Sequence, residues 1–294
     1  MVENKSLSRR VFEVVNYTGL LLLSLLCIFP IAHILAISFS SSSAATAGLV
    51  GIWPVEFTTK SYSFVVSEPA FLKSFVVTLK RLVFGVSLNM VLGVMVAYAL
   101  SKEVKDFRFR TIYVWIFVLT MLFNGGLIPT YMVVMKMGLI DSIWALILPS
   151  AVNVFNIILI LNFFRGLPKE LLEAAFIDGA NHWKTLLRVV IPVSMPVLAT
   201  VTLFSLVGHW NEWFSGLIYM SSPDNYPLQS YLQTVIVSKD FSRLTVADLT
   251  LLGTVSDRTV KAAQIFLGTV PILLVYPFLQ RYFMSGIVMG SVKE

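Results

Sequence analysis

Charged residues are scarce in this chain: Asp, Glu, Lys and Arg make up only 13% of its 294 residues, whereas 57% are hydrophobic. Soluble domains carry about one-quarter charged residues, so this composition excludes an ordinary soluble protein. The apolar residues are gathered in repeated runs that are long enough to cross a bilayer. The sequence therefore predicts a polytopic membrane protein, and we expect residues 1–294 to form a single transmembrane domain.

Several chemistry-bearing patterns are also missing. The single cysteine, Cys27, has no partner for an intramolecular disulfide, and we expect it to pack as a small hydrophobic residue. His33, His182 and His209 are scattered over different segments, which predicts neither a metal site nor a catalytic cluster. The chain has no Gly-x-x-x-x-Gly-Lys-Ser/Thr loop to hold the phosphates of ATP, so any ATP hydrolysis has to come from a partner. No basic run is interleaved with aromatic residues, which argues against a nucleic-acid partner.

Six apolar stretches are candidate membrane spans of about 20 residues each. The first follows Lys5, Arg9 and Arg10 like a secretory signal, but its apolar run exceeds a signal core of about 7–15 residues, so we expect an uncleaved helix. The third and fourth are joined by KMGLIDS, which predicts a short turn between antiparallel helices. Together the stretches predict an all-α polytopic bundle with spans near residues 13–38, 82–100, 111–135, 143–164, 188–219 and 262–284.

The basic residues favour one orientation in the membrane. Lys and Arg are enriched in cytoplasmic loops, and here they are concentrated at the N-terminus and in the loops 101–110 and 165–188. These segments alternate along the chain, which predicts that both termini are cytoplasmic. Lys80 and Arg81 precede the second span on the opposite side, and we expect them at the outer interface with their stems along apolar surface.

The longest polar passage between two spans is PKELLEAAFIDGANHWKTLLRVVIP, residues 168–192. Pro168 suits the first position of a helix, the residues after it follow an amphipathic pattern, and Gly179 permits the left-handed conformation that stops a helix. Asn181 suits the N-cap of a second helix. The pattern alone predicts a helix, a turn and a second helix along the membrane surface, either as an interfacial helix in the headgroups or as a simple connector.

A spaced motif in this passage favours a third interpretation. EAA at 173–175, Gly179 and VVIP at 189–192 closely resemble the EAA loop of ABC importer permeases, with Val189 and Ile191 in place of Ile and Leu. The stretches FNGGLIPTYMVVMKMGLIDSIWALILPS, GHWNEWFSGLIYM and RYFMSGIVMGSVKE resemble the carbohydrate-uptake branch of that family. They are similar to the second permease of the maltose transporter and to permeases for oligosaccharides from polysaccharides such as alginate and pectin. This resemblance implies a type I ABC importer permease with six transmembrane helices in the bacterial cell (inner) membrane.

The resemblance also implies partners. In this family the EAA helix fits a cleft of the ATPase, so that closure driven by nucleotide moves the membrane helices, and the loop 168–185 would have this cytoplasmic role here. The implied partners are a second permease in a heterodimer, two cytoplasmic ATPases that bind ATP and Mg²⁺, an extracytoplasmic solute-binding protein, an oligosaccharide and membrane lipid. This chain itself would bind no cofactor. The implied coupling residues are Glu173, Ala174, Ala175, Asp178, Gly179 and Pro192.

The fifth span carries GHWNEWF near its end. A continuous helix that starts near residue 189 and rises about 1.5 Å per residue brings Glu212 roughly 35 Å away, near the outer boundary. Two interpretations stay open there. One is an aromatic belt at the interface, and the other is a sugar path in which indole faces cover pyranose rings while amides and carboxylates bind hydroxyl groups. The candidate pathway residues are Asn153, Asn156, His209, Asn211, Glu212 and Trp213.

The segment 220–261 is a long polar loop between the fifth and sixth spans. Loops of this length without a function are uncommon, and this one resembles the region that reaches towards the binding protein in the maltose system. The resulting candidates for contact with an extracytoplasmic binding protein are Asp224, Tyr226, Gln229 and Tyr231.

Two other classes of function compete with a permease. A secondary transporter of a small polar solute typically needs titratable residues or broken helices near the bilayer midplane, whereas His33 and Glu212 lie towards the outer ends of their predicted spans. A membrane-embedded enzyme acting on glycans or lipids needs clustered acid, base or metal-binding groups at one face. Among permease substrates, Lys80 and Arg81 suit an acidic oligosaccharide, and they suit an interface anchor equally well.

Overall fold

The computed structural model describes residues 7–237 and 256–291. Within these ranges the chain forms helices joined by turns, with no β-strand. This confirms the all-α prediction. The chain divides into two compact units, of which the first contains residues 1–69 and 235–269 and the second contains residues 70–234 and 270–294.

A long N-terminal helix dominates the first unit. α1 (Leu7–Ser38) has 32 residues, which gives about 48 Å at 1.5 Å per residue and exceeds the roughly 30 Å hydrocarbon core of a bilayer. Most of its large apolar side chains are exposed in the isolated chain, as a helix facing lipid requires. Its end packs with α2 (Ser42–Thr46) and the start of α16 (Asp257–Ser291), and α3 (Lys60–Ser67) completes the unit. The predicted first span is therefore a continuous helix.

The second unit is organised along its longest helix, α4 (Pro69–Ser101). Proline suits the first turn of a helix, and α4 begins there rather than at residue 82 as predicted. The other elements are α5 (Arg110–Leu122), α6 (Leu127–Lys136), α7 (Ile143–Ile147), η1 (Leu148–Ser150), α8 (Val154–Arg165), α9 (Lys169–Ile177), α10 (His182–Thr185), the π-helix η2 (Leu186–Val190), α11 (Ile191–Val193), α12 (Met195–Asn211), α13 (Phe214–Tyr219), η3 (Pro223–Asn225) and α14 (Leu228–Val237).

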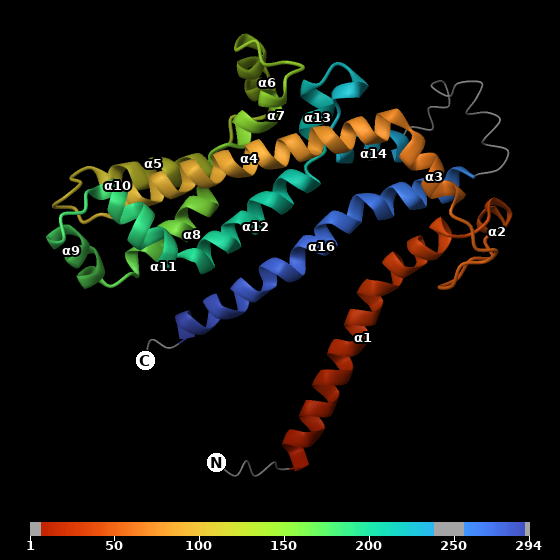
Figure 1. Cartoon of the computed structure of the whole chain (residues 1–294), viewed down its shortest axis with the longest axis horizontal. Coiled ribbons are helices and arrows are strands. Elements are labelled where there is room, and N and C mark those ends of the chain that lie inside the picture. Colours follow the sequence, from red (N-terminus) through yellow and green to blue (C-terminus); the bar gives the residue numbers. More distant parts are fainter. Residues whose placement is uncertain (1–6, 238–255, 292–294) are drawn as a thin grey trace. The chain divides into compact units, whose positions relative to one another are not determined.

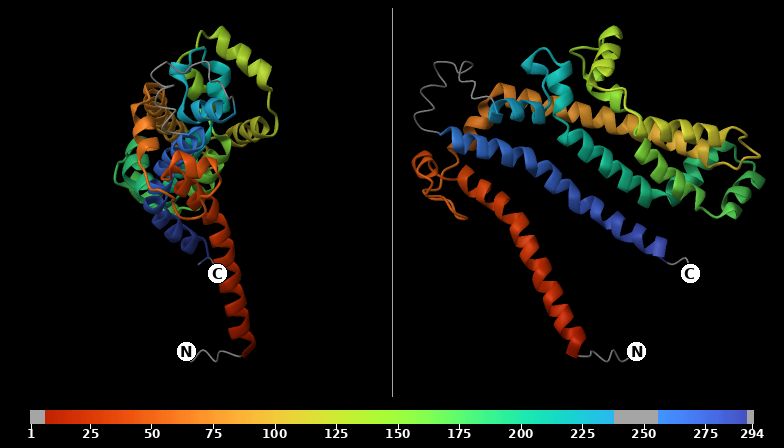
Figure 2. Two further views of the ribbon diagram at one scale, coloured as in Figure 1. Left: turned by 90° about the vertical axis from the view of Figure 1, so that its right-hand side faces the viewer. Right: turned by 180° about the vertical axis from the view of Figure 1, so that it is seen from behind.

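The main core of the second unit lies where α4, α8, η2 and α12 pack together. Figure 1 shows α4 running along α12, with α9 and α10 at one end of this unit and α13 and α14 at the other, and Figure 2 shows these elements from two further sides. The packed side chains are aliphatic and aromatic, and between membrane helices they stabilise the unit by close van der Waals contact. They are Val94, Ala97, Tyr98, Leu100, Ile160, Leu161, Phe164, Leu186, Val190, Leu198 and Val201.

Three of the six predicted spans are bent rather than continuous. The bends are 112° between α5 and α6, 48° between the α7–η1 segment and α8, and 83° between the α10–α11 segment and α12. In the described residues, three helices are long and apolar enough to cross a membrane, and there are six spans if each bent pair counts as one. The six predicted apolar segments are therefore found, three of them as bent pairs, and the continuous helix assumed from residue 189 to Glu212 is wrong.

The breaks have local causes. Gly126, between α5 and α6, has φ +90°, a conformation that glycine adopts without a Cβ clash. Asn153 caps α8 by accepting a hydrogen bond from a backbone N–H three residues later, so the helix restarts there. In the fifth segment, Pro192 and Pro196 flank Ser194 and remove two backbone donors, which ends one helix and begins the next in a new direction.

Candidate functional site

The predicted coupling loop has the helix, glycine and helix arrangement that the sequence indicated. Pro168 is the residue immediately before α9 rather than its first helical residue. Gly179 has φ +78°, and the N–H of Ala180 donates to the carbonyl of Ala175 at 2.9 Å, which closes the end of α9. Asn181 caps α10 by accepting from a backbone N–H at 2.9 Å, as predicted.

The candidate coupling residues lie mainly on one exposed helix. Ala175 is buried against the rest of the unit, whereas Glu173, Ala174, Asp178 and Gly179 are exposed. Ile177, beside them, is 86% exposed, which is unusual for an isoleucine at the end of a helix. Leu171 and Phe176 of α9 are also exposed, at 39% and 40%, and grouped exposed apolar side chains suit contact with another chain. Pro192 is exposed too, but it lies beyond η2 in α11 and is not part of α9.

The coupling loop is held against the end of α4 by polar contacts. Lys169 forms an ion pair with Glu103, which also pairs with Lys105 at 3.2 Å. Hydrogen bonds from Lys169 and Lys105 lower the pKa of Glu103, and the same contact with Glu103 raises the pKa of Lys169. This pair places the two basic loops 101–110 and 165–188 at the same end of the unit, as the charge pattern predicted.

Aromatic contacts reinforce this junction. The Nζ atom of Lys102 lies 3.9 Å from the centroid of the Tyr98 ring and 5.6 Å from that of Phe176 on α9. The hydroxyl of Tyr98 is 3.4 Å from Nδ1 of His182 on α10. Both helices of the coupling loop therefore contact the C-terminal end of α4 or the residue that follows it. These contacts join residues that are more than 70 positions apart, so no local pattern predicts them.

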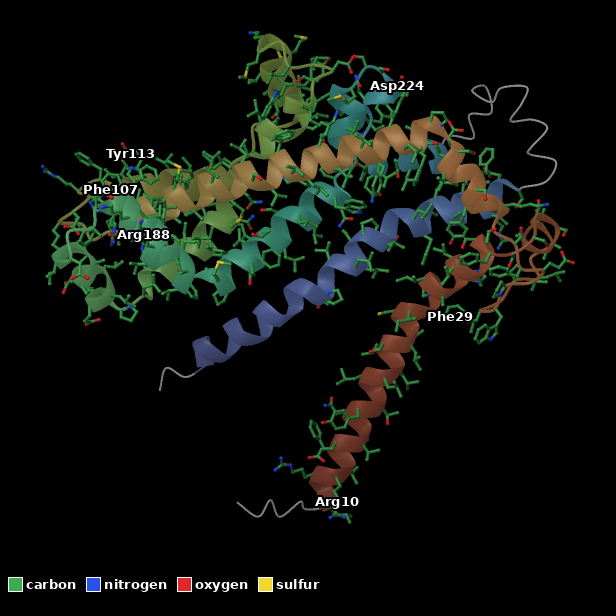
Figure 3. All side chains as sticks on the ribbon, viewed as in Figure 1. Arg10, Phe29, Phe107, Tyr113, Arg188 and Asp224 are labelled. Atoms are coloured by element: carbon green, nitrogen blue, oxygen red, sulfur yellow. The ribbon has the colours of Figure 1, made fainter. Side chains whose placement is uncertain are left out.

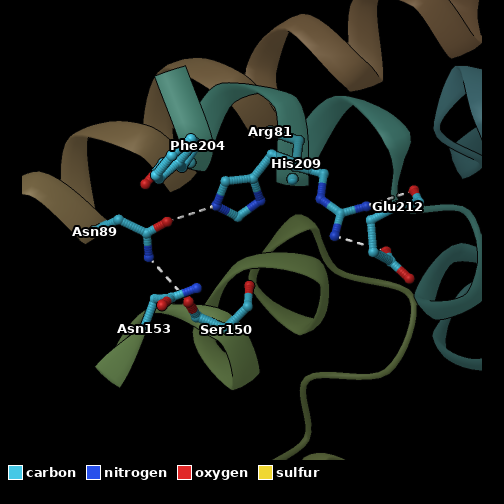
Figure 4. Close-up of a pocket in the computed structure, with 9 residues that line it drawn as sticks. Arg81, Asn89, Ser150, Asn153, Phe204, His209 and Glu212 are labelled. Carbon is cyan, nitrogen blue, oxygen red and sulfur yellow. Dashed lines mark hydrogen bonds and ion pairs between the residues drawn. The ribbon is translucent and has the colours of Figure 1, made fainter. Parts of the chain in front are cut away.

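A buried ion pair lies towards the other end of α4. Arg81 is 2% exposed, and its Nη2 lies 2.7 Å from Oε2 of Glu212, while its Nη1 donates to the backbone carbonyl of Glu212 at 3.2 Å (Figure 4). Glu212 also accepts hydrogen bonds from the N–H of Ser215, at 2.8 Å, and from the Ser215 hydroxyl. Arg81 does not lie with its stem along an exposed apolar surface, as predicted, because its side chain is buried inside the unit. Lys80 is exposed.

A separate set of hydrogen bonds lies further along α4, around Asn89. The NH₂ group of Asn89 donates to the carbonyls of Ser150 and Ala151 at 2.9 and 2.8 Å, so its oxygen faces His209, whose Nε2 lies 3.0 Å away. Because an amide oxygen only accepts, His209 donates from Nε2. Gly85 makes room for the ring, since a Cβ there would lie 2.8 Å from two atoms of His209.

These residues line a cavity of about 200 Å³ between α4, α12 and the segment before α8 (Figure 4). Three of the six predicted pathway residues are brought together in it: Asn153, His209 and Glu212. Arg81 was not among the candidates, although an arginine and a glutamate in two different apolar segments are a recognisable signal for a pair inside a membrane protein. The remaining lining residues are Ser150, Phe204, Ser205 and Gly208.

The other predicted pathway residues lie outside the cavity. Asn156 is buried, and its NH₂ group donates to the hydroxyl of Ser205 at 3.1 Å. Asn211 is the exposed last residue of α12. Trp213 is exposed between α12 and α13, and its carbonyl accepts a hydrogen bond from Ser230 at 2.6 Å. The predicted straight helix through residue 212 is interrupted here, so Glu212 caps the end of α12 instead.

The first part of the predicted loop 220–261 is folded onto the unit. Asp224 is exposed and pairs with Lys73 at 3.0 Å; Figure 3 places it at the α13 end, opposite the α9 end. Tyr226 is half-buried against the cluster around Tyr219. Gln229 is half-buried.

Tyr231 is also partly enclosed. Its ring lies edge-on to Phe71 of α4, with 6.4 Å between the ring centroids. Beside it, the N–H of Leu228 donates to the Thr78 hydroxyl at 2.7 Å, which ties the start of α14 to α4. The predicted loop therefore begins with helices rather than as extended chain. Its residues 238–255 lie outside the described residues.

Comparison with known proteins identifies the family. Residues 74–288 match the model described as "Binding-protein-dependent transport system inner membrane component". The chain is 38% identical over 291 residues to the polygalacturonan/rhamnogalacturonan transport system permease protein YtcP of Bacillus subtilis (strain 168), covering 98% of this chain and 100% of that protein. It is 39% identical over 284 residues to Protein LplC of the same organism, covering 97% and 95%.

Solved structures agree with this assignment. A chain in the crystal structure of a bacterial ABC transporter involved in the import of the acidic polysaccharide alginate is similar with a TM-score of 0.88 and 35% identity, covering 95% of this chain and 98% of that one. A chain of the bacterial alginate ABC transporter in complex with an alginate pentasaccharide-bound periplasmic protein has a TM-score of 0.52 at 16% identity, covering 93% and 95%, which shows the fold alone. This chain therefore belongs to the family of binding-protein-dependent transport system inner membrane components, and it is a permease subunit with the type I ABC importer fold.

Proposed function

We propose that this permease forms half of the translocation pathway of an ATP-driven importer for an oligosaccharide derived from a polysaccharide such as alginate or pectin. The observation that carries the proposal is the exposed α9 helix, ended by Gly179 and followed at once by α10. This element presents Glu173, Ala174 and Ile177 outward while α10 and η2 lead directly towards α12. A push on α9 would thus be transmitted to a membrane segment.

The partners follow from this arrangement. A second permease would supply the other half of the pathway, because a single unit with many exposed apolar helices cannot enclose a polar path alone. Two cytoplasmic ATPases would bind ATP and Mg²⁺, since this sequence has no P-loop. An extracytoplasmic solute-binding protein would deliver the sugar near the α13 end, where Asp224, Tyr226, Gln229 and Tyr231 lie. No cofactor is needed on this chain.

The orientation is part of the proposal. The loops 101–110 and 165–188 each hold four of the 22 Lys and Arg residues, and they are joined by the pair between Glu103 and Lys169. Positive loops favour the cytoplasm, so the α9 end would face the ATPases in the bacterial inner membrane. Both termini would then be cytoplasmic and the α13 end would face the outside.

The substrate class rests on the nearly full-length relatives. The protein with 38% identity is named for polygalacturonan and rhamnogalacturonan, and the structure with 35% identity for the acidic polysaccharide alginate. Both names refer to polymers that contain uronic acids. The polar cavity beside Arg81 and His209 supports a hydrophilic cargo, because buried polar groups in a membrane protein mark solute paths.

Substitutions in the coupling loop test the proposal. In the complete importer reconstituted in proteoliposomes, Gly179→Asp and Glu173→Lys should leave assembly in the membrane intact but abolish sugar uptake and the ATPase stimulation by loaded binding protein. Gly138→Asp is the matched control, because Gly138 also has positive φ, +67°, and also has no heavy atom within 4 Å of an added Cβ, but lies outside the loop. Normal uptake by Gly179→Asp, or uptake without ATPase subunits, would overturn the proposal.

A further inference from the structure

The cavity beside α4 contains an arginine whose hydrogen bonding is incomplete. Arg81 has its Nη1 and Nη2 on Glu212, but no described residue accepts a hydrogen bond from its buried Nε. A buried donor without an acceptor is destabilising, so such groups are rare, and a ligand is one way to satisfy them. Arg81 lines the cavity, which is the space from which a ligand can reach it.

The glutamate that faces Arg81 has a second set of partners. Glu212 is 34% exposed, and its carboxylate accepts from the N–H and the hydroxyl of Ser215. If another carboxylate occupied the guanidinium, Glu212 would therefore keep two hydrogen bonds. Arg81 has no such alternative, because it is almost completely buried. Replacing Glu212 by another carboxylate at the guanidinium is therefore less costly than leaving Arg81 without any carboxylate.

The remaining walls suit a sugar ring. Exposed Asn153 and the Ser150 hydroxyl offer groups that can bind hydroxyls. The ring of Phe204 is 41% exposed and lines the same cavity, which provides an apolar face of the kind that packs against a pyranose. A guanidinium fork, neutral hydrogen-bonding groups and an aromatic ring match the three parts of a uronic acid unit: its carboxylate, hydroxyls and C–H face.

We propose that this cavity is a binding site for one uronate unit of the transported sugar. The carboxylate of that unit binds the guanidinium of Arg81 and displaces the carboxylate of Glu212. The inference rests on the proposed function and names residues that would set its preference for acidic sugars. Glu212 limits the affinity by competing for the same guanidinium, so the unit can leave again. A transport site requires both binding and release.

Binding to the purified importer without its solute-binding protein tests the site directly. The probes are trigalacturonate and its fully methyl-esterified form, which match in size but differ in charge. Calorimetric titration in lipid nanodiscs should show the acid binding at least about tenfold more tightly than the ester, because charge-assisted hydrogen bonds are roughly twice as strong as neutral ones. Equal affinities of the two probes for the wild-type importer would overturn the inference.

A matched pair of substitutions locates the preference. Asn153→Asp keeps the N-cap of α8 but adds a carboxylate inside the cavity, so the acid-to-ester affinity ratio should fall by about tenfold. Asn181→Asp makes the same change at the N-cap of α10, outside the cavity, and should leave that ratio unchanged. The site would be contradicted if Asn153→Asp left the acid-to-ester affinity ratio unchanged. It would also be contradicted if Asn181→Asp lowered that ratio as much as Asn153→Asp does.

Glu212→Gln provides a second readout that does not depend on weak-binding titrations. This variant leaves Arg81 without its counter-charge, so trigalacturonate should raise its unfolding temperature more than that of the wild type, whereas the ester should not. An equal rise with both probes contradicts carboxylate exchange. The site and the proposed function can fail separately. If uptake is ATP-driven and is abolished by Gly179→Asp, but the importer shows no preference for the acid, only the site is refuted. If there is no ATP-driven uptake, the proposed function is refuted.

Discussion

Two ion pairs lie towards opposite ends of α4 and differ in burial. Arg81 is 2% exposed and meets Glu212, which is 34% exposed, whereas Lys169 and Glu103 are 73% and 40% exposed. Removing a charge from water costs several kcal/mol unless a partner is well placed, so the first pair depends on its geometry. The second pair stays hydrated and contributes little to stability. An ion pair therefore holds the side chains near Arg81 in a defined geometry, whereas the ion pair at the other end of α4 constrains the structure only weakly.

The surroundings of the two pairs differ in the same sense. Near Arg81, Gly85 is packed so closely on His209 that a Cβ would have no room. At the other end, Gly179 has no heavy atom within 4 Å of the position of a Cβ. Close packing keeps the cavity residues in one arrangement, while open space lets the coupling loop adjust to a partner. One helix thus joins a rigid site to an adaptable junction.

The largest effect should come from breaking the buried pair. Glu212→Gln leaves the Arg81 guanidinium buried without a counter-charge and should lower the free energy of unfolding by about 3 kcal/mol. Arg81→Gln combined with Glu212→Gln removes both charges and should recover at least half of that loss. Denaturation midpoints in detergent measure the stability of Glu212→Gln, Arg81→Gln and the double variant. A double variant as unstable as the sum of the single variants would show that the two residues are not coupled.

The next effect concerns packing along α4. Gly85→Ala places a Cβ 2.8 Å from the ring of His209 and should destabilise the protein by about 1–3 kcal/mol, because the ring has to leave Asn89. Gly93→Ala is the matched control on the same helix. Its Cβ would meet Ile160 at an ordinary 3.5 Å, so it should be neutral or stabilise by up to about 1 kcal/mol. Similar midpoints for both variants would contradict the rigid packing inferred for this end.

The coupling loop was predictable from sequence because its geometry is set locally. Two short-range signals have the predicted roles. Gly179 ends a helix, and Asn181 accepts a hydrogen bond from the N–H three residues later. The cavity was predictable only in part, because the sequence indicated some of its lining residues but not Arg81. Arg81 became a lining residue because α4 begins at Pro69, and its partner Glu212 is 131 positions away. No local pattern contains either fact.

The positions and sizes of the bends were not predicted, for a related reason. Hydropathy measures the average composition of a segment, and the segments 111–135 and 188–219 are predominantly apolar. It does not report where backbone hydrogen bonding is interrupted. The signals were present in Gly126 and in Pro192 and Pro196, but glycine and proline are common inside membrane helices because neighbouring groups satisfy the freed backbone atoms.

A smaller effect should follow from removing the cation at the adaptable end. Lys102→Met keeps the apolar stem but removes the charge that lies over the Tyr98 ring. Cation–π contacts are worth about 0.5–1 kcal/mol at such sites, so amide exchange in α9 should become roughly two- to fivefold faster. Lys105→Met, at an exposed lysine three positions away, should change this exchange less. An equal response of α9 to both variants would mean that the ring contact does not hold the loop.

The smallest effect should come from the exposed pair, and it should depend on pH in a defined way. Hydrogen bonds from Lys169 and Lys105 lower the pKa of Glu103, so its contribution is present above the unfolded value of about 4.3 and is lost as pH falls through the folded one. The pKa of Lys169 is raised, so its contribution is present below about 10.4 and is lost as pH rises through the folded value. Between pH 6 and 9 the pair is therefore constant, and Glu103→Gln should shift α9 exchange, corrected for its intrinsic rate, by the same small factor throughout. Added salt should shrink that factor, because the charges are exposed. A transition inside this pH range that Glu103→Gln removes would show that the contact at this end is buried like the one at Arg81, and the contrast between the two ends of α4 would then be lost.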